Sequence, residues 1–147
     1  DADFKQLYTG GNGPGESGAA IFETPDEVMS SWIAQALSEN ELEQFLGGID
    51  FVSQIVVSLS FGERQNATGT IHLSDVNYNS IYTSLRVSGL IGVTEPGCDE
   101  PYSKSYPFVL GVAPRPETVP RVPSVFLQNF GDGCKPIMKG TQVSIAE

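Results

Sequence analysis

The sequence predicts an α+β fold, in which an antiparallel β-sheet, arranged as a sandwich or a partly open barrel, carries two short N-terminal helices packed on it. Two helix-capping patterns occur before residue 50, and apolar residues recur at every second position in several later segments. The 16 glycines and 10 prolines require many turns, which favours a β-rich fold over a helical bundle. Strands joined by short turns are expected to be antiparallel, because a parallel connection needs a longer crossover.

The length of 147 residues is that of one ordinary domain. Residues 1–18 contain a glycine-rich stretch and are expected to form a flexible N-terminal segment, while residues 19–147 form the α+β core. Within the first segment, Phe4, Leu7 and Tyr8 predict one short edge strand.

Charge and hydropathy argue against two features, a nucleic-acid partner and a membrane-spanning segment. The chain carries 8 Lys and Arg residues and 18 Asp and Glu residues, so its formal net charge is −10. A negative field repels phosphate backbones, and nucleic acid is therefore not expected as a partner. The sequence contains no apolar run of about 18 residues, so no transmembrane segment is expected.

Two capped helices are predicted between residues 24 and 48. Thr24 is the expected N-cap of the first, with Pro25 at the first helical position and Glu27 completing a capping box. Ser38 and Glu41 repeat the same spacing and start the second helix.

Trp32, the only tryptophan, lies in the apolar stripe of the first helix. We expect it to pack on the sheet, and the alternative is a ligand-stacking role. Glu39, Glu41 and Glu43 resemble an acidic cluster in the second helix, but alternate positions of a helix point to different sides. They are expected to be a solvated face that suits the helix dipole.

The clearest strand lies just after the helices. Apolar residues occupy every second position there: Ile55, Val57, Leu59 and Phe61. Their neighbours are mostly small or polar, which is typical of a half-buried strand. Residues 62–69 are expected to form a polar turn, after which Ile71, Leu73 and Val76 continue on a return strand. Residues 52–77 are therefore predicted to form a hairpin.

Other strands and one connector are predicted from the same patterns. The proline-rich segment 113–123 is expected to run across the surface as an extended connector. The strand candidates are 19–23, 53–62, 69–78, 81–93, 105–112, 124–129 and 141–146.

Both cysteines, Cys98 and Cys134, lie in loops rich in glycine, proline and aspartate. They are expected to form one disulfide, which the chain-entropy model values at roughly 3–4 kcal/mol. This pairing indicates a periplasmic or extracellular protein associated with the cell envelope, whereas free thiols in a reducing compartment are the alternative. The chain begins with Asp-Ala-Asp-Phe, so we expect a mature form that has lost a targeting segment, such as a signal peptide or that of a lipoprotein.

Few residues offer chemistry. His72, the only histidine, is expected to face solvent on its strand, since neither a Gly-x-Ser-x-Gly motif nor a set of zinc ligands accompanies it. The disulfide would bring Asp99, Glu100 and Asp132 together as a candidate Ca²⁺ site. No other metal and no cofactor is expected. Asn66 begins a glycosylation triplet in a turn, to which no role is assigned.

Residues 45–114 resemble the core of the PrcB family, named for a protease complex subunit. Ile49-Asp50-Phe51 precedes an apolar strand that ends at Gly62-Glu63-Arg64. Thr68-Gly69 matches part of the family's Thr-Gly-Gly-Tyr turn, although Thr70 and Ile71 replace its last two residues. This departure puts any function of the turn in doubt. Independently of the family, Asp50 is expected to pin its loop through backbone N–H groups.

A later part of the chain is similar to the same family. The Pro-Gly-Cys of residues 96–98 and the Tyr-Pro-Phe of residues 106–108 match its polar loop and proline-containing strand. The resemblance implies a secreted or periplasmic bacterial protein that associates with a surface protease, with no catalytic residue that transfers to this chain.

The sequence thus favours an extracytoplasmic, non-enzymatic accessory or binding protein whose partner is a protease or another envelope protein. Binding is expected through sheet edges or through exposed tyrosines, the candidates being Tyr78, Tyr82, Tyr102 and Tyr106. One alternative is a carboxylate-dependent hydrolase of polysaccharide or peptide, for which no particular carboxylate pair is indicated. Another is a small-ligand carrier with a deep apolar pocket under the helices.

Overall fold

The computed structural model describes residues 4–95, 97–98, 104–120, 122–138 and 143–145. The helices are α1 (Pro25–Met29), α2 (Ile33–Ala36) and α3 (Glu39–Gly47). The strands are β1 (Lys5–Gly10), β2 (Ser17–Phe22), β3 (Gln54–Phe61), β4 (Arg64–Gln65), β5 (Ala67–Asn79), β6 (Ser84–Val93), β7 (Lys104–Ser105), β8 (Phe108–Pro114), β9 (Ser124–Gly131) and β10 (Val143–Ile145).

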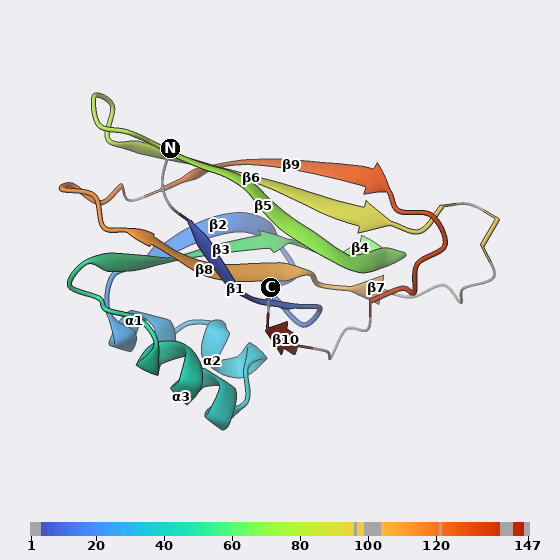
Figure 1. Cartoon of the computed structure of the whole chain (residues 1–147), viewed down its shortest axis with the longest axis horizontal. Coiled ribbons are helices and arrows are strands. Elements are labelled where there is room, and N and C mark those ends of the chain that lie inside the picture. Colours follow the sequence, from blue (N-terminus) through green and yellow to red (C-terminus); the bar gives the residue numbers. More distant parts are fainter. Residues whose placement is uncertain (1–3, 96, 99–103, 121, 139–142, 146–147) are drawn as a thin grey trace.

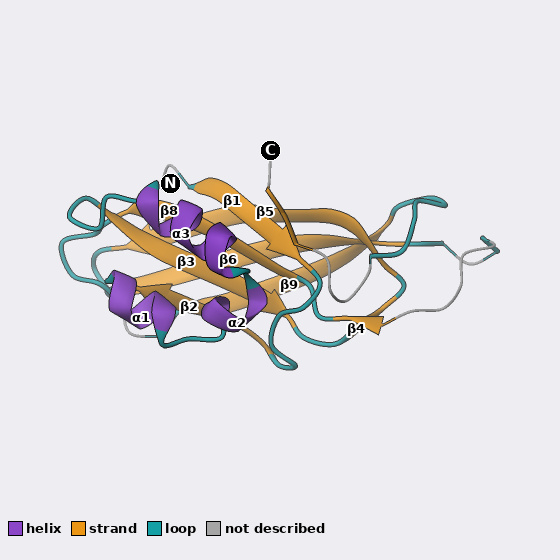
Figure 2. Cartoon of the chain, turned by 90° about the horizontal axis from the view of Figure 1, so that it is seen from below, coloured by secondary structure: helices purple, strands orange, loops and turns teal. Residues whose placement is uncertain are grey.

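Two β-sheets lie face to face, and the helices cover the outer face of one of them (Figures 1 and 2). The larger sheet has the strand order β10-β1-β8-β3-β2, the smaller has the order β5-β6-β9, and β4 and β7 form a separate short pair. The predicted α+β class with a β-sheet and short helices is confirmed. Of the two arrangements expected, the described strands form a sandwich of open sheets.

Strand β3 is buried on both faces. Ile55, Val57 and Leu59 point into the core between the two sheets, where they join the apolar residues of β5 and β6. Val56 points the other way, into a second core formed with the helices. Ser58 is also fully buried on that side. The expectation of a half-buried strand is therefore wrong, because the helices cover the face that carries the smaller side chains.

The predicted hairpin of residues 52–77 does not form. Strand β3 pairs with β2 and β8, whereas β5 pairs with β6 in the other sheet. Between them the chain crosses from one sheet to the other, with positive φ angles of 73° at Gly62 and 59° at Asn66. Phe61 and Ile71 still meet in one core, but across the sandwich rather than side by side. An alternating pattern identifies the buried face of a strand and leaves its hydrogen-bonding neighbour undetermined.

Both predicted helix starts are present. Thr24 accepts a hydrogen bond from the backbone N–H of Glu27, and Ser38 forms a complete capping box with Glu41. The first predicted helix is divided into α1 and α2, because the Ser31 hydroxyl donates to the carbonyl of Val28 and accepts from the N–H of Ile33.

The helices are anchored on the sheet by the second core. Trp32 packs edge-on against Phe108 of β8, with ring centroids 5.2 Å apart, as expected of an anchor. Val28, Ile33 and Phe45 fill the space between the helices and the sheet.

Strand β1 lies inside the larger sheet, between β8 and β10, rather than at an edge. Its side chain Gln6 also links the two sheets, because its amide donates to the carbonyl of Ile71 at 3.2 Å and accepts from the N–H of Leu73 at 3.1 Å. The glycine-rich stretch that follows is held as well, since the N–H of Gly13 donates to the carbonyl of Tyr106. These contacts hold a segment that was expected to be flexible.

The smaller sheet departs from the expected antiparallel pairing. Strand β6 pairs with β9 in parallel, from Arg86 opposite Ser124 to Val93 opposite Gly131. This pairing is possible because β7, β8 and the connector after β8 lie between the two strands in the sequence and provide a long crossover.

Candidate functional site

Three loops lie at the same end of the sandwich and expose large apolar side chains. They are the turn 50–53 before β3, the turn 80–83 between β5 and β6, and the connector 115–123 between β8 and β9, all at the left of Figure 1. The exposed side chains are Val52 (86% exposed), Ile81 (82%), Tyr82 (78%) and Val122 (84%). We call these residues the loop-end surface. Large apolar side chains exposed on several loops at one end of a molecule are candidates for contact with a partner.

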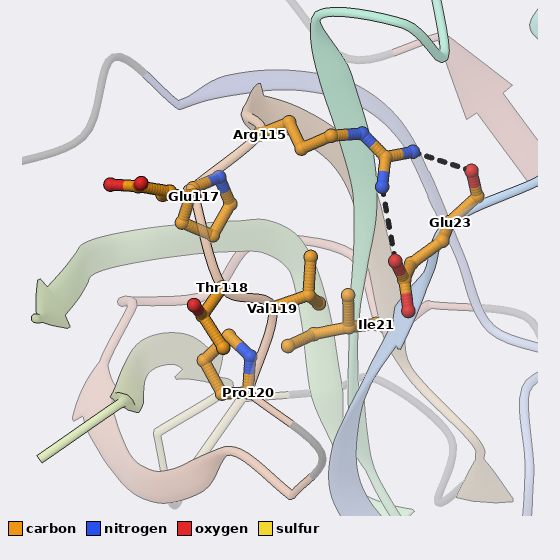
Figure 3. Close-up of a pocket in the computed structure, with 8 residues that line it drawn as sticks. Ile21, Glu23, Arg115, Glu117, Thr118, Val119 and Pro120 are labelled. Carbon is orange, nitrogen blue, oxygen red and sulfur yellow. Dashed lines mark hydrogen bonds and ion pairs between the residues drawn. The ribbon is translucent and has the colours of Figure 1, made fainter.

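Arg115 holds two of these loops together. Its guanidinium forms an ion pair with the carboxylate of Glu23 at 3.0 Å and donates to the backbone carbonyls of Glu23 and Phe51 (Figure 3). Its backbone N–H donates to the carbonyl of Ser53 at 2.8 Å. Since these contacts engage the guanidinium on several sides, Arg115 is a structural residue that fixes the connector against the turn 50–53.

The turn 50–53 is also fixed from within. The carboxylate of Asp50 accepts hydrogen bonds from the N–H of Val52 at 3.0 Å and from the hydroxyl of Ser53 at 3.1 Å. This is the pinning role expected for Asp50. The turn therefore presents Val52 to solvent in a defined position.

The tip of the β5–β6 hairpin is a preformed turn. The side-chain carbonyl of Asn79 accepts from the N–H groups of Ile81 at 2.9 Å and Tyr82 at 3.2 Å. Thr83 completes the reversal with φ = 49°. The hydroxyl of Tyr78 donates to the carbonyl of Thr118 at 3.0 Å, which ties the hairpin to the connector. The exposed tip is thus held in one conformation by local bonds.

A pocket of about 710 Å³ lies beside these loops (Figure 3). Ile21 and Val119 lie against one another within it and provide apolar surface, while Glu117 and Thr118 are exposed at its rim. The lining is mainly polar, with a smaller apolar part at Ile21 and Val119, so it could receive a polar or amphipathic side chain of a binding partner. Its lining residues are Ile21, Glu23, Arg115, Pro116, Glu117, Thr118, Val119 and Pro120.

The four candidate tyrosines do not form one surface. Tyr82 lies on the loop-end surface, and Tyr78 is half-buried beneath it. Tyr106 lies near the opposite end, after β7, where its hydroxyl donates to the carboxylate of Glu63 at 3.2 Å. Tyr102 lies outside the described residues.

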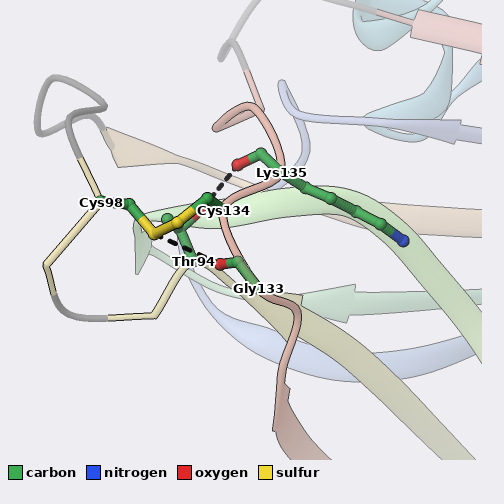
Figure 4. Close-up of a disulfide and its surroundings, with 5 residues drawn as sticks. All are labelled: Thr94, Cys98, Gly133, Cys134 and Lys135. Atoms are coloured by element: carbon green, nitrogen blue, oxygen red, sulfur yellow. Dashed lines mark hydrogen bonds between the residues drawn. A yellow bond between two sulfur atoms is a disulfide. The ribbon is translucent and has the colours of Figure 1, made fainter.

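The predicted disulfide between Cys98 and Cys134 is present, with Cα atoms 5.5 Å apart. It joins the loop after β6 to the loop after β9 (Figure 4). The hydroxyl of Thr94 donates to the carbonyl of Lys135 at 2.8 Å, and the N–H of Glu95 donates to the carbonyl of Gly133 at 2.9 Å. The two loops are therefore joined by covalent and polar bonds.

Asp132, in the loop after β9, accepts hydrogen bonds from side chains of β5. Its carboxylate accepts from the hydroxyls of Thr68 at 2.6 Å and Thr70 at 2.7 Å, and lies 3.1 Å from the ammonium of Lys135. The Thr68 hydrogen bond is the largest cause that holds the pKa of Asp132 below its ordinary value, with Thr70 and Lys135 acting in the same direction against the effect of burial. A Cβ atom at Gly92 would collide with this network.

The candidate Ca²⁺ site is only partly described. Asp99 and Glu100 lie outside the described residues, and the carboxylate of Asp132 is already engaged by the two threonines and Lys135. In the part of the chain that the structure describes, no group of three His, Cys, Asp or Glu side chains is placed to hold a metal ion.

The remaining acid–base candidates have other positions. His72 is exposed on β5, as expected. Glu41 accepts from the N–H of Ser38 in the capping box, and Glu39 and Glu43 are exposed on α3, so these carboxylates do not converge. The side-chain oxygen of Asn66 is buried without a hydrogen-bond partner.

No family model, no curated protein and no solved structure matches this chain significantly. Within the described ranges, none of the helices is long and apolar enough to cross a membrane.

Sequence reasoning included Tyr82 but missed the other members of the loop-end surface. The available signal was an apolar residue inside a turn: Val52 follows Asp50-Phe51, and Ile81 follows Asn79-Ser80. A large apolar residue in a short turn is a candidate contact residue when it lies outside the adjoining strands.

Proposed function

We propose that this protein is an extracytoplasmic, non-enzymatic accessory protein that binds another protein through the loop-end surface. The observation that carries this proposal is the grouping of Val52, Ile81, Tyr82 and Val122, all largely exposed, on three loops at one end of the sandwich. Exposed aliphatic and aromatic side chains supply binding energy when a partner buries them, and tyrosine is common among such anchors.

The fixed conformation of the loops supports binding rather than incidental exposure of these side chains. Arg115, Asp50 and Asn79 each use a side chain to hold one of these loops in place. A surface that is already ordered loses little conformational entropy when it binds, so more of the contact energy appears as affinity. The pocket beside the loops adds a place for one side chain of the partner.

The chemistry of these loops and the family resemblance support the choice of partner. Glu117 and Asp50 are exposed near the apolar side chains, so the matching surface has an apolar centre and basic or neutral groups around it. The resemblance of residues 45–114 to the PrcB family supports a surface protease or another envelope protein as the partner. The Cys98–Cys134 disulfide is compatible with an oxidising compartment.

The test is co-purification of the cross-linked protein from envelope extract, followed by titration with the purified partner. The double variant Ile81→Ser/Tyr82→Ser is expected to weaken binding at least about tenfold, because truncation of central apolar anchors typically costs more than 1 kcal/mol each. The control is Met29→Ser, which removes an exposed apolar side chain on α1 instead.

Binding that is equally strong in the double variant and in the control would refute the loop-end surface as the contact. Circular dichroism of both variants excludes a loss of fold as the cause of weaker binding.

A further inference from the structure

Strand β9 forms an edge of the smaller sheet that lacks the usual protection. It pairs with β6 in a continuous register over its whole length, and within the described ranges no strand pairs with its other side. Its sequence, SVFLQNFG, contains no charged residue and no proline. Exposed edge strands normally carry lysine, proline or a bulge that prevents pairing with another chain.

The opposite edge of the same sheet shows what protection looks like. Strand β5 has two register shifts, between Ala67 and Ile71 and between Leu73 and Asp75. The side chain of Gln6 also occupies backbone groups of Ile71 and Leu73 on this edge. One edge of the sheet is thus interrupted and capped by a side chain. Strand β9 is regular, and the Arg64 guanidinium donates to the side chain of Asn129 at 3.0 Å rather than to a backbone group of this edge.

The side chains of β9 divide between the core and solvent. Val125 and Leu127 pack against the core between the sheets. Alternation along the strand places Phe126, Gln128 and Phe130 on the outer face, where Phe126 is 55% exposed and Phe130 is half-buried.

This pattern is complementary to itself. In an antiparallel pair of two β9 strands with a two-fold axis at Gln128, each Phe126 lies opposite the Phe130 of the other copy, and Gln128 lies opposite its own copy. Directly opposite residues in an antiparallel pair share a face, so two cross-strand aromatic pairs form on the outer face. Leu127 lies opposite Asn129, and no charge opposes a like charge within the strand, although each copy carries a formal charge of −10.

We propose that a second copy of this chain pairs with β9 in this antiparallel register and joins the two smaller sheets into one continuous six-stranded sheet. The resulting interface is isologous, as in most homodimers. Because the two strands run in opposite directions, the two loop-end surfaces lie at opposite ends of the dimer. The proposal does not depend on the proposed function, since it uses neither the loop-end surface nor its partner.

The experiment is sedimentation velocity of the complete chain over a wide range of concentrations. A reversible monomer–dimer equilibrium is expected for the natural sequence. Gln128→Lys and Gln128→Glu each place two like charges directly opposite one another at the axis, and each is expected to weaken the homodimer at least about tenfold. An equimolar mixture of the two variants places Lys opposite Glu and is expected to restore the dimer.

The matched control is Gln35→Lys, the same change at an exposed position of α2, which is expected to leave the dimer intact. Gln128 is exposed, so its variants are expected to keep the fold, and their thermal unfolding curves verify this. A natural chain that stays monomeric at every concentration would overturn the proposal. So would a dimer that both Gln128 variants leave unchanged, or variants that fail to recover on mixing, because the second copy would then use another surface.

Discussion

The two sheets of this protein are built from similar strands and held in different ways. In the larger sheet, β3 and β8 are buried on both faces, because the helices cover one face and the smaller sheet covers the other. In the smaller sheet, β5 and β9 alternate between partly or fully buried and exposed residues, and the outer face meets solvent. The first sheet has two apolar layers to stabilise it, and the second has one.

Polar and covalent contacts supplement the single layer of the smaller sheet. Gln6 holds the outer edge of β5, the Asp132 network holds the loop after β9, and the disulfide joins the loops that follow β6 and β9. The difference teaches that a sheet with one face free for contacts is secured at one edge and at the loops that follow its strands. The loop-end surface and the unprotected β9 edge include parts of this sheet, although Val52 comes from the chain before β3.

The sharpest test of this comparison exchanges one phenylalanine in each sheet for alanine. Phe108→Ala removes a fully buried ring that Trp32 packs against and is expected to cost about 3–5 kcal/mol of unfolding free energy. Phe126→Ala, on the outer face of β9, is expected to change it by less than about 0.5 kcal/mol. Urea unfolding followed by circular dichroism at low protein concentration measures both, and equal losses would show that the two sheets do not differ in this respect.

The second prediction concerns the disulfide. Replacing both Cys98 and Cys134 by serine is expected to cost roughly 3–4 kcal/mol, because the unfolded chain is no longer constrained across this loop. Hydrogen exchange is expected to show the largest loss of protection in β6 and β9 and a smaller one in β3. The natural protein under reducing conditions serves as the control, and uniform loss across all strands would contradict a local role.

The third prediction concerns the close approach at Gly92. Gly92→Ala places a methyl group against the Thr68 hydroxyl and the Asp132 carboxylate, so it is expected to cost about 1–3 kcal/mol. Gly69→Ala is the matched control, because nothing lies within 4 Å of the added methyl group there. Thermal unfolding compares the stability of the two variants. If Gly92→Ala is as stable as Gly69→Ala, the Thr68 and Asp132 side chains can move to make room for the methyl group.

The smallest expected effect is that of Asp132→Asn, about 0.5–1.5 kcal/mol at neutral pH from weakened hydrogen bonds. Its pH dependence is more informative. The pKa of Asp132 is lower in the folded than in the unfolded chain, so its stabilising contribution is present above the unfolded pKa, near 4, and is lost as the pH falls through the folded pKa. The natural protein should lose stability below about pH 4 more steeply than Asp132→Asn.

The control for this pH dependence is Asp75→Asn, at a half-buried carboxylate that lies 3.8 Å from Arg86. Urea unfolding at several acidic pH values gives the slopes. If Asp75→Asn and Asp132→Asn reduce the loss of unfolding free energy at acidic pH equally, general charge repulsion rather than the Thr68 network causes that loss.

Local patterns in the sequence predicted the local features of the fold. The caps at Thr24 and Ser38, the strand that contains Ile55, and the anchoring Trp32 depend on neighbouring residues and are all present. The disulfide was predictable from composition, because the chain contains only two cysteines.

Features that depend on distant residues were not predictable in this way. The alternation of apolar residues in β3 and β5 does not show that the two strands belong to different sheets. Likewise, the residues near Ser124 do not indicate that β9 pairs in parallel with β6 from Arg86 onward. The loop-end surface was missed in part because the loops that carry Val52 and Val122 come to the same end of the sandwich as the hairpin tip only through tertiary structure. Sequence alone therefore predicted the elements better than it predicted the surfaces between them.

The position of β1 has a consequence for when the protein folds. Its outer neighbours are β8 and β10, so Tyr8 pairs with Leu110 on one side and Ile145 on the other. The larger sheet is consequently not complete until the last described strand has been synthesised. Contacts between such remote segments make folding slow. During synthesis the larger sheet therefore lacks its edge strand until the segment that forms β10 has emerged from the ribosome.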